Sequence, residues 1–385
     1  MIVKLIGIGA AGNKAAINAV ENKVIAIENV MLINSTLRDI PADYKGLKVE
    51  YAGSYGGCGK ERNIAFDLAM SNLQNGSLPL NEFLCLEDET KKAELVVIVN
   101  STEGGTGSGS SIVIGKYIQQ VLGIQVHMFG FMGFKSDVRG LKNTVEWFQE
   151  LEEDFTVECI ENSKFLAECR DNEMKAEMAA NVEFGKKLGI LMGNPIRDSS
   201  HNIDPTDLLK ASTQKGFMII ESANFEKIKN REQFEAVVTD MIDNSKSIDI
   251  ADITSKKIAT IININAAATD FISYKNILIE RYGNAYEMFI HIQHEADMPE
   301  FIAVIVSGVK MPVKEVQKIH SEYKARMERI DRNQDSFFTA SKNLKLDDDS
   351  DLSLKNNKPT VSASDFFGKM STAKKESEKD KFSDY

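Results

Sequence analysis

The stretch EGGTGSGS, residues 103–110, lies between two apolar runs, ELVVIVNST directly before it and IVIGKYIQQ shortly after it. Four of its eight residues are glycine and three carry a hydroxyl group. Glycine loses more conformational freedom on folding than any other residue and brings no side chain to a core. We therefore expect an exposed loop whose backbone holds a ligand.

The segments around this stretch indicate a parallel sheet. Strands that alternate with helices form such sheets, with helices on both faces, and ligands bind beyond the carboxyl ends of the strands. The glycine-rich turns lie at those ends. Apolar runs predict strands at 3–8, 30–33, 95–99 and 126–131, with helices at 14–20, 61–73 and 111–122 between them.

Two other glycine-rich turns, GIGAAGN at residues 7–13 and GSYGGCGKERN at residues 53–63, also lead into predicted helices. Glycine lets a ligand approach the backbone closely, and a helix N-terminus presents free N–H groups to an anion. Three such turns at one sheet edge can surround a triphosphate, with the hydroxyl groups of Thr106, Ser108 and Ser110 as further donors. The sequence contains no G-x-x-x-x-G-K-[ST] string, which argues against a Walker-type nucleotide site.

The first turn also fits the G-x-G-x-x-G pattern of dinucleotide-binding folds, through Gly7, Gly9 and Gly12. A nicotinamide-dependent enzyme would place Asp or Glu after its second strand to hold the ribose hydroxyl groups. Asn34 stands at that position. An oxidoreductase is therefore the less favoured alternative.

The rest of the chain indicates a second, smaller domain. A long helix is predicted from about residue 171 to 192, and GNP at 193–195 ends it. Strand-like runs at 257–265, 287–293 and 300–309 and a charged helix at 313–330 indicate an α+β domain. The predicted organisation is a nucleotide-binding domain (1–170), a central helix (171–195), a C-terminal domain (196–332) and a tail (333–385).

The predicted tail has few large aliphatic residues, so we expect it to be disordered when the protein is alone. It is either a solubilising tail or a segment that docks on a partner through Phe366, Phe367 and the lysines of residues 374–381.

The segment GGTGSG at residues 104–109 resembles the signature of tubulins and of the bacterial cell-division GTPase FtsZ. The order and spacing of the three turns agree with that superfamily, and the resemblance extends over roughly residues 1–330. It implies a Rossmann-like GTP-binding domain, a central helix and a smaller C-terminal domain, with GTP or GDP and Mg²⁺ as cofactors. The chain departs from the pattern at Glu103, where the family usually has glycine. An acid there either disturbs the site or points away into solvent.

The resemblance also implies which residues surround the nucleotide. Asn162, after the strand TVECIE, would touch the nucleotide, Asn181 on the central helix would read the guanine edge, and the loop ending at Arg139 would approach the ribose. No metal-ligating residue is identified. The expected nucleotide-binding residues are Gly9, Ala10, Ala11, Asn13, Gly56, Gly57, Gly104, Gly105, Thr106, Gly107, Ser108, Arg139, Asn162 and Asn181.

The stretch HNIDPTDLL, residues 201–209, follows the central helix and fits the N-x-D-x-x-D pattern of FtsZ-like proteins through Asn202, Asp204 and Asp207. In that family the loop acts on the γ-phosphate bound by the next subunit, where carboxylates orient or polarise the attacking water. Such a head-to-tail contact extends into a filament and does not close into a dimer. The alternative is that Asp204 and Asp207 only cap a helix that starts near Thr206.

The general design resembles the TubZ group of plasmid- and phage-encoded tubulins more than FtsZ or eukaryotic tubulin. In that group filaments move DNA, and the C-terminal tail engages a small DNA-binding adaptor, TubR. A net charge of −11 agrees with a filament that does not grip DNA itself. The alternatives are a phage spindle tubulin of the PhuZ type, a filament protein that does not hydrolyse GTP, and a nicotinamide-dependent enzyme.

The expected location is the bacterial cytoplasm, without membrane contact. The four cysteines are scattered and form no C-x-x-C pair, which favours reduced thiols over a disulfide framework. No apolar run in the sequence is long enough to cross a bilayer.

Overall fold

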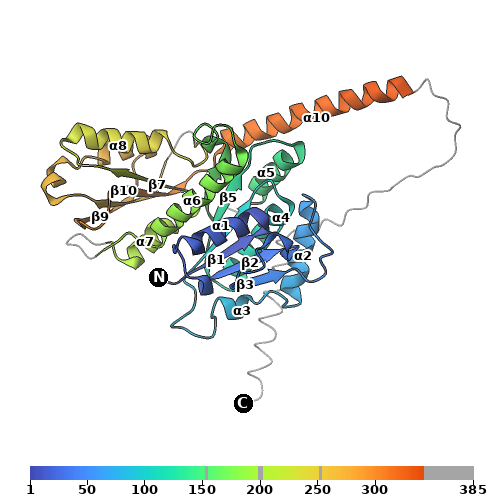
Figure 1. Ribbon diagram of the computed structural model, residues 1–385, viewed down its shortest axis with the longest axis horizontal. Coiled ribbons are helices and arrows are strands. Elements are labelled where there is room, and N and C mark those ends of the chain that lie inside the picture. Colours follow the sequence, from blue (N-terminus) through green and yellow to red (C-terminus); the bar gives the residue numbers. More distant parts are fainter. Residues whose placement is uncertain (152–154, 198–202, 251–253, 342–385) are drawn as a thin grey trace, which may run out of the picture.

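The computed structural model describes residues 1–151, 155–197, 203–250 and 254–341. One sheet of ten strands runs through both halves of this part of the chain, in the order β3-β2-β1-β4-β5-β6-β7-β10-β8-β9 (Figure 1). The strands are β1 (Val3–Ile8), β2 (Val30–Asn34), β3 (Leu47–Glu50), β4 (Leu95–Ser101), β5 (Gln125–Met132), β6 (Thr156–Glu161), β7 (Gly216–Phe225), β8 (Lys257–Asn263), β9 (Glu287–Gln293) and β10 (Glu300–Val309).

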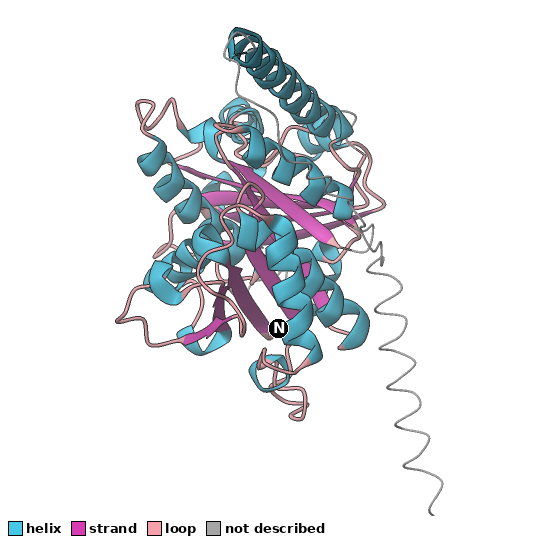
Figure 2. Ribbon diagram, turned by 90° about the vertical axis from the view of Figure 1, so that its right-hand side faces the viewer, coloured by secondary structure: helices cyan, strands magenta, loops and turns pink. Residues whose placement is uncertain are grey.

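Helices cover both faces of the sheet (Figure 2). Alternate residues of β4 point to two separate cores, Val96 and Ile98 to one and Val97 and Val99 to the other. The first core also contains side chains of α2, α4, α5, α8, α9 and α10, and the second contains side chains of α1, α6 and α7. The helices are α1 (Gly9–Glu21), α2 (Arg62–Gln74), α3 (Leu80–Phe83), α4 (Gly105–Lys116), α5 (Val138–Glu150), α6 (Glu173–Leu191), α7 (Pro205–Ser212), α8 (Arg231–Asp243), α9 (Lys275–Tyr282) and α10 (Val313–Ser341).

The predicted parallel sheet is confirmed for the first half of the chain, where β1 to β6 pair only in parallel. Strand β1 lies at a change of direction, because it pairs with β2 on one side and with β4 on the other. The helices that follow β1 and β4 lie on opposite faces, α1 on one and α4 on the other. A crevice opens beyond the strand ends at such a switch point, and ligands of open α/β sheets bind there.

The stretch 103–110 is not the exposed loop that its composition predicts. Helix α4 begins at Gly105, and every residue from Gly105 to Lys116 is buried. A Cβ on Gly105 would lie 2.8 Å from the Cα of Lys60, and one on Gly109 would lie 2.4 Å from the carbonyl oxygen of Arg62. The glycines therefore let the backbone of α2 and of the turn before it approach α4 closely. This packing between segments distant in sequence outweighs the low helix propensity of glycine.

The two halves of the sheet meet at β6 and β7, which pair through Thr156 with Gly216 and Val157 with Phe217. Beyond this point, the segment 246–248 takes the place of β7 beside β6. The N–H of Ile248 donates to the carbonyl of Cys159 at 2.9 Å, and the N–H of Glu161 donates to that of Lys246 at 2.9 Å. The sheet is therefore continuous, but the row of strand pairs at this joint is short.

The second half contains the expected α+β domain. Strand β10 runs antiparallel to β7 and β8, and β9 is parallel to β8. Helix α6 agrees with the predicted central helix, whereas β7, α8 and α9 were not predicted. Helix α10 continues to Ser341, past residue 333 where the tail was predicted to begin, and it extends beyond α5 (Figure 1). Within the ranges that the structure describes, no helix is long and apolar enough to span a membrane.

Candidate nucleotide-binding site

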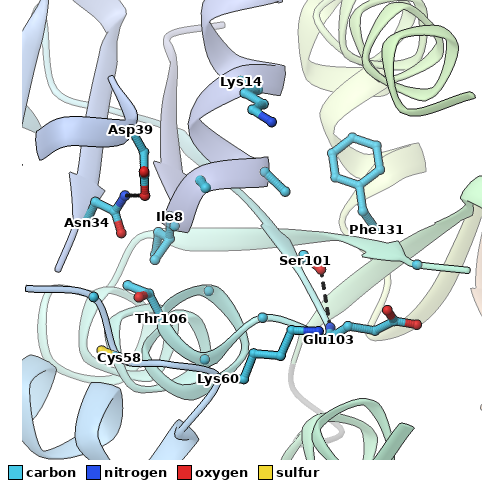
Figure 3. A pocket seen from close by; sticks show the side chains of 18 of the residues that line it. Ile8, Lys14, Asn34, Asp39, Cys58, Lys60, Ser101, Glu103, Thr106 and Phe131 are labelled. Carbon is cyan, nitrogen blue, oxygen red and sulfur yellow. Dashed lines mark hydrogen bonds between the residues drawn. The ribbon is translucent and has the colours of Figure 1, made fainter. Parts of the chain in front are cut away.

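A cavity of about 380 Å³ lies at the carboxyl ends of β1 and β4, at the switch point of the sheet (Figure 3). Its walls come from the first turns of α1 and α4, the end of β2, the turn at residues 57–60, the loop after β5, and α6. Segments far apart in the sequence therefore converge on one hollow, at the place where an α/β sheet of this topology binds its ligand.

The first turns of α1 and α4 make this cavity suited to an anion. Neither helix has a side-chain cap from the described residues, and neither carries an acidic residue in its first turn. Their first backbone N–H groups are therefore left to bind a ligand, and both helix dipoles place partial positive charge there. Two helix N-termini in one cavity form a phosphate-binding arrangement.

Close backbone contacts hold the two N-termini together. Gly9 has a φ of 74°, and a Cβ there would lie 2.9 Å from the backbone nitrogen of Gly107, so only glycine fits. The hydroxyl groups of Ser35 and Thr106 lie 2.9 Å apart, and the hydroxyl of Ser54 donates to the carbonyl of Ser35 at 2.5 Å. These bonds tie the end of β2 and the second glycine-rich turn to α4.

Two lysines add positive charge to the cavity. Lys60 lines it from the second turn and forms an ion pair with Asp137 at the start of α5. The amide of Asn143 on α5 donates to the carbonyl groups of Lys60 and Glu103, at 3.0 and 2.9 Å, and so fixes both loops. Lys14 lies on α1, and Figure 3 shows it across the cavity from Thr106 and Lys60.

Glu103, the departure from the family pattern, points away from the phosphate-binding end. Its carboxylate accepts the backbone N–H of Lys135 at 3.0 Å, and in Figure 3 it faces away from Thr106. Because Gly133 and Gly140 have no side chains, the carboxylate fills the space beside them. Burial raises the pKa of Glu103, although the bond from Lys135 opposes this effect. The acid therefore joins the signature stretch to the loop after β5, and solvent does not surround it.

The structure brings most of the predicted binding residues together. Lining the cavity are Gly9, Ala10, Ala11, Gly57, Gly104, Gly105, Thr106, Gly107, Asn162 and Asn181. Asn162 is 8% exposed, and its Oδ1 has no hydrogen-bond partner among the described residues. A buried acceptor of this kind needs a partner, and a bound ligand can provide one.

The other predicted binding residues lie outside the described lining of the cavity. Asn13 is buried behind the first turn, where its amide donates to the carbonyl of Ile33 at 3.3 Å. The hydroxyl of Ser108 bonds to the carbonyl of Gly104 inside α4, and Arg139 pairs with Glu61. Gly56 has a φ of 123°, and a Cβ added to it would have no other atom within 4 Å. Ser110, also expected to donate, bonds instead to the carbonyl of Thr106 at 2.6 Å.

Sequence reasoning did not identify several residues of the cavity wall. Two of them could have been found from the sequence, because Lys60 lies in a glycine-rich turn and Glu177 lies one helical turn before Asn181. Asp39 had none: it comes from a short 3₁₀ turn and accepts a bond from the amide of Asn34 at 3.1 Å. The additional lining side chains include Lys14, Asn34, Ser35, Asp39, Cys58, Lys60, Phe131, Phe134 and Glu177.

The predicted catalytic residues lie apart from this cavity. Asp204 is the N-cap of α7, where its Oδ1 accepts the N–H of Asp207 at 2.7 Å. Asp207 lies 3.5 Å from the ammonium of Lys210. The N–H of Ile203 donates to Nδ1 of His291 on β9 at 3.4 Å, which holds the start of α7 against the second half of the sheet. Asn202 lies outside the described residues.

No metal cluster is built by the protein itself within the described ranges, since no three His, Cys, Asp or Glu residues gather there. Mg²⁺ does not require one, because it is commonly held by substrate phosphates with one or two carboxylates and water.

Solved structures provide the comparison with known proteins. No protein-family model and no curated protein sequence matches the chain. TubZ of Clostridium botulinum phage c-st is 15% identical, with a TM-score of 0.66 over 85% of this chain and 98% of that one. A GTPγS-form protofilament of Bacillus thuringiensis serovar israelensis TubZ is 16% identical, with a TM-score of 0.70 over 87% and 94%. The GTPγS-bound protofilament of CetZ2 from Haloferax volcanii is 16% identical, with a TM-score of 0.69 over 85% and 100%.

These similarities cover 85–87% of this chain, at a sequence identity of 15–16%, which shows the fold alone. The chain therefore has the tubulin/FtsZ-type fold of the TubZ and CetZ proteins.

Proposed function

We propose that this protein is a GTPase that assembles head to tail into filaments and uses them to segregate plasmid or phage DNA. One observation carries the proposal: the two parts of the expected machinery lie apart along α6, the cavity beside the middle of the helix and the predicted catalytic residues beyond its C-terminal end. Asn181, in the middle of the helix, lines the cavity, whereas Asp204 and Asp207 follow the last turn of the helix at Leu191. A subunit stacked on the next one would bring its own α7 to its neighbour's cavity.

The residues act in this proposal as two half-sites. The first turns of α1 and α4 hold the phosphates, and the neighbour's Asp204 and Asp207 orient the attacking water. Mg²⁺, carried by the phosphates, would offset the charge that develops on them. The protofilaments formed by the TubZ and CetZ proteins with this fold support the assembly step.

The test measures GTP turnover per subunit against protein concentration, together with sedimentation in GTP, GDP and GTPγS. We expect negligible turnover in dilute solution and a steep rise above the concentration at which filaments sediment. A turnover rate per subunit that does not depend on concentration would place the chemistry within one chain. Equal competition by ATP would exclude the guanine assignment, and binding of NAD(H) without GTP turnover would favour the oxidoreductase.

The two roles of Asp204 are separated by a matched pair of variants. Asp204→Asn keeps a good N-cap but removes the carboxylate, whereas Asp204→Ala removes both. We expect both variants to bind GTP and to lose turnover about a hundredfold, with an additional loss of about 1 kcal/mol of stability in Asp204→Ala alone. Full turnover in Asp204→Asn would leave Asp204 as a helix cap only. Asp207→Ala tests the second carboxylate in the same assay.

The DNA-segregation role rests on the acidic composition and on the TubZ-type fold. We propose that the tail recruits a DNA-binding adaptor of the TubR kind. Because α10 continues to Ser341, the informative truncation ends after that residue and not at Asn333. A chain ending at Ser341 should assemble normally but fail to bind the adaptor, which pull-down with filaments measures. Full adaptor binding by this truncation would contradict the tail's role.

A further inference from the structure

Two polar side chains, His291 and Gln293, are completely buried on β9, the outer strand of the second half of the sheet (Figure 1). They lie two residues apart on the strand, so they point to the same face of the sheet. That face carries the second core, which also contains Ile203 and Leu208 from the start of α7 and just before it. Burying a polar group costs free energy unless the group is hydrogen-bonded. Both side chains therefore need partners inside the protein.

Gln293 holds the first part of the connection between α6 and α7. Its Oε1 accepts the backbone N–H of Arg197 at 2.8 Å, and its Nε2 donates to the carbonyl of Pro195 at 3.0 Å. The same Nε2 lies 3.8 Å from the sulfur of Met298. The residues that follow α6 are thereby tied to β9.

His291 holds the last part of the same connection. Its Nδ1 accepts the backbone N–H of Ile203 at 3.4 Å. Because Nδ1 is the acceptor, Nε2 carries the proton and donates to Oε1 of Gln293 at 2.9 Å. The far end of α7 is held separately, since the hydroxyl of Ser307 donates to the carbonyl of Ala211. Both ends of α7 are therefore fixed, and the end that begins the helix depends on His291.

These bonds determine where Asp204 lies. Asp204 directly follows Ile203, and its side chain accepts the N–H of Asp207, so its orientation follows the start of α7. Apolar residues in place of His291 and Gln293 would suit the core, but the backbone groups that they now bind would lose these partners. A group that acts on a reacting molecule must be held closely in place, because a misplacement of about 1 Å can cost about a hundredfold in rate.

We propose that His291 and Gln293 are positioning residues for GTP hydrolysis, which hold Ile203, and through it Asp204, in the place from which Asp204 acts on the nucleotide of the next subunit. This inference rests on the proposed function and adds to it the residues that position the acid. The described lining of the nucleotide cavity includes neither His291 nor Gln293. Binding of GTP by the same subunit should therefore not depend on them.

The test compares His291→Asn with His291→Gln in the full chain, above the concentration at which it sediments with GTP. The Oδ1 of asparagine takes the place of Nδ1 and can accept from Ile203, whereas glutamine places its polar atoms near Nε2 and leaves Ile203 without this acceptor. We expect both variants to bind GTP as wild type does. Turnover per sedimented subunit should fall about tenfold or more in His291→Gln, and His291→Asn should keep most of it.

His294→Leu is the matched control for a loss of stability. His294 lies just beyond β9, but its Nδ1 lies 2.7 Å from the carbonyl oxygen of Ile264, which is not part of the connection between α6 and α7. Its turnover per sedimented subunit should equal that of wild type. Gln293→Leu removes the bonds to Pro195 and Arg197, so it should lower turnover in the same way as His291→Gln.

A double-mutant cycle shows whether His291 acts through Asp204. In an Asp204→Asn background, His291→Gln should cause no further loss of turnover. Full turnover in His291→Gln or Gln293→Leu, an equal loss in both His291 variants, or additive losses in the cycle would overturn the positioning role and leave the proposed function intact. A wild-type turnover per subunit that does not depend on concentration would overturn the proposed function itself.

Discussion

The ammonium of Lys187 on α6 lies 2.8 Å from Oε1 of Glu158 on β6, and the two side chains are 1% and 0% exposed. They lie where the two halves of the sheet meet, and Glu221 on β7 approaches the same ammonium at 3.3 Å. The hydroxyl oxygen of Ser247 lies within hydrogen-bond distance of both carboxylates, at 2.6 and 2.9 Å. Three elements and the segment 246–248 are thus joined by one buried polar cluster.

The cluster has one cation for two carboxylates, so it holds one negative charge too many when all three groups are ionised. Burial raises the pKa of Glu158 to about 7, although Lys187 and Ser247 oppose this, and its Oε2 has no partner in the described part of the chain. Burial alone would lower the pKa of Lys187, but Glu158 and Glu221 outweigh it and raise that pKa. Lys187 therefore stays charged, and Glu158 is the group that takes up a proton.

The first prediction concerns this proton. The folded protein keeps it up to a pH of about 7, whereas an unfolded chain releases it near 4.5. Stability from Glu158 is therefore present below pH 4.5 and is lost as the pH rises through 7. Glu158→Gln cannot lose this proton, so its free energy of unfolding relative to wild type should increase by up to about 3 kcal/mol between pH 4.5 and 8. Urea titration across this range measures it.

The matched control for this prediction is Glu226→Gln, since Glu226 is exposed. Its free energy of unfolding, measured over the same pH range, shows what the loss of a surface carboxylate does without the buried cluster. A constant difference for Glu158→Gln would mean that Glu158 is ionised in the folded protein throughout.

The second prediction concerns a buried group that makes the protein less stable as the pH falls, whereas Glu158 makes it less stable as the pH rises. His127 on β5 is 0% exposed, and neither ring nitrogen has a partner among the described residues. Burial lowers the pKa of His127 to about 3, from 6.5, so stability is lost as the pH falls below 6.5. His127→Leu should raise the free energy of unfolding by about 1–3 kcal/mol at pH 7, and by more at pH 5. His294→Leu should instead lower it, because Nδ1 of His294 lies 2.7 Å from the carbonyl oxygen of Ile264.

The sequence predicts this fold well where local patterns decide it. The runs at 3–8, 287–293 and 300–309 match β1, β9 and β10, since apolar strand patterns reflect burial on the sheet. It fails for Gly105 to Ser110, because their helical state depends on contact with α2. Asn162 and Asn181 could be placed by resemblance, but Asp39 could not, because nothing in the sequence marks the short 3₁₀ turn from which it comes. Arg139, expected near the ribose, pairs with Glu61, a residue far away in sequence whose position no local pattern predicts.

The third prediction separates packing from helix propensity at two buried helical glycines. Propensity alone favours alanine over glycine by about 1 kcal/mol. In α4, a Cβ on Gly109 would lie 2.4 Å from the carbonyl oxygen of Arg62, so Gly109→Ala should lower the free energy of unfolding by about 1–3 kcal/mol. In α6, a Cβ on Gly185 would lie 3.7 Å from the side chain of Val24, so Gly185→Ala should raise it by about 0.5–1 kcal/mol. Thermal and urea unfolding of both variants measure the difference. Stabilisation by Gly109→Ala would mean that α2 is free to move away from α4.

The fourth prediction tests the place of Glu103. A Cβ on Gly133 would lie 2.2 Å from Oε2 of Glu103, whose carboxylate is held by the N–H of Lys135. Gly133→Ala should therefore destabilise the protein by about 1–3 kcal/mol. In a Glu103→Ala background the same substitution should cost less than about 0.5 kcal/mol. A double-mutant cycle of unfolding free energies gives this coupling, and additive effects would show that the carboxylate lies elsewhere.

The short pairing of β6 with β7 has a mechanical consequence. Tension between the two halves of the molecule is borne by the Thr156–Gly216 and Val157–Phe217 pairs, the segment 246–248, the buried cluster around Lys187, the body of α6 and the packing of α10 on α5. Elsewhere, longer rows of strand pairs share the load, seven residues long between β4 and β5 and seven between β8 and β10. Each half is therefore stiffer than the connection between them. Deformation imposed from outside is concentrated at this connection, which lets the two halves tilt against each other while the sheet within each half keeps its shape.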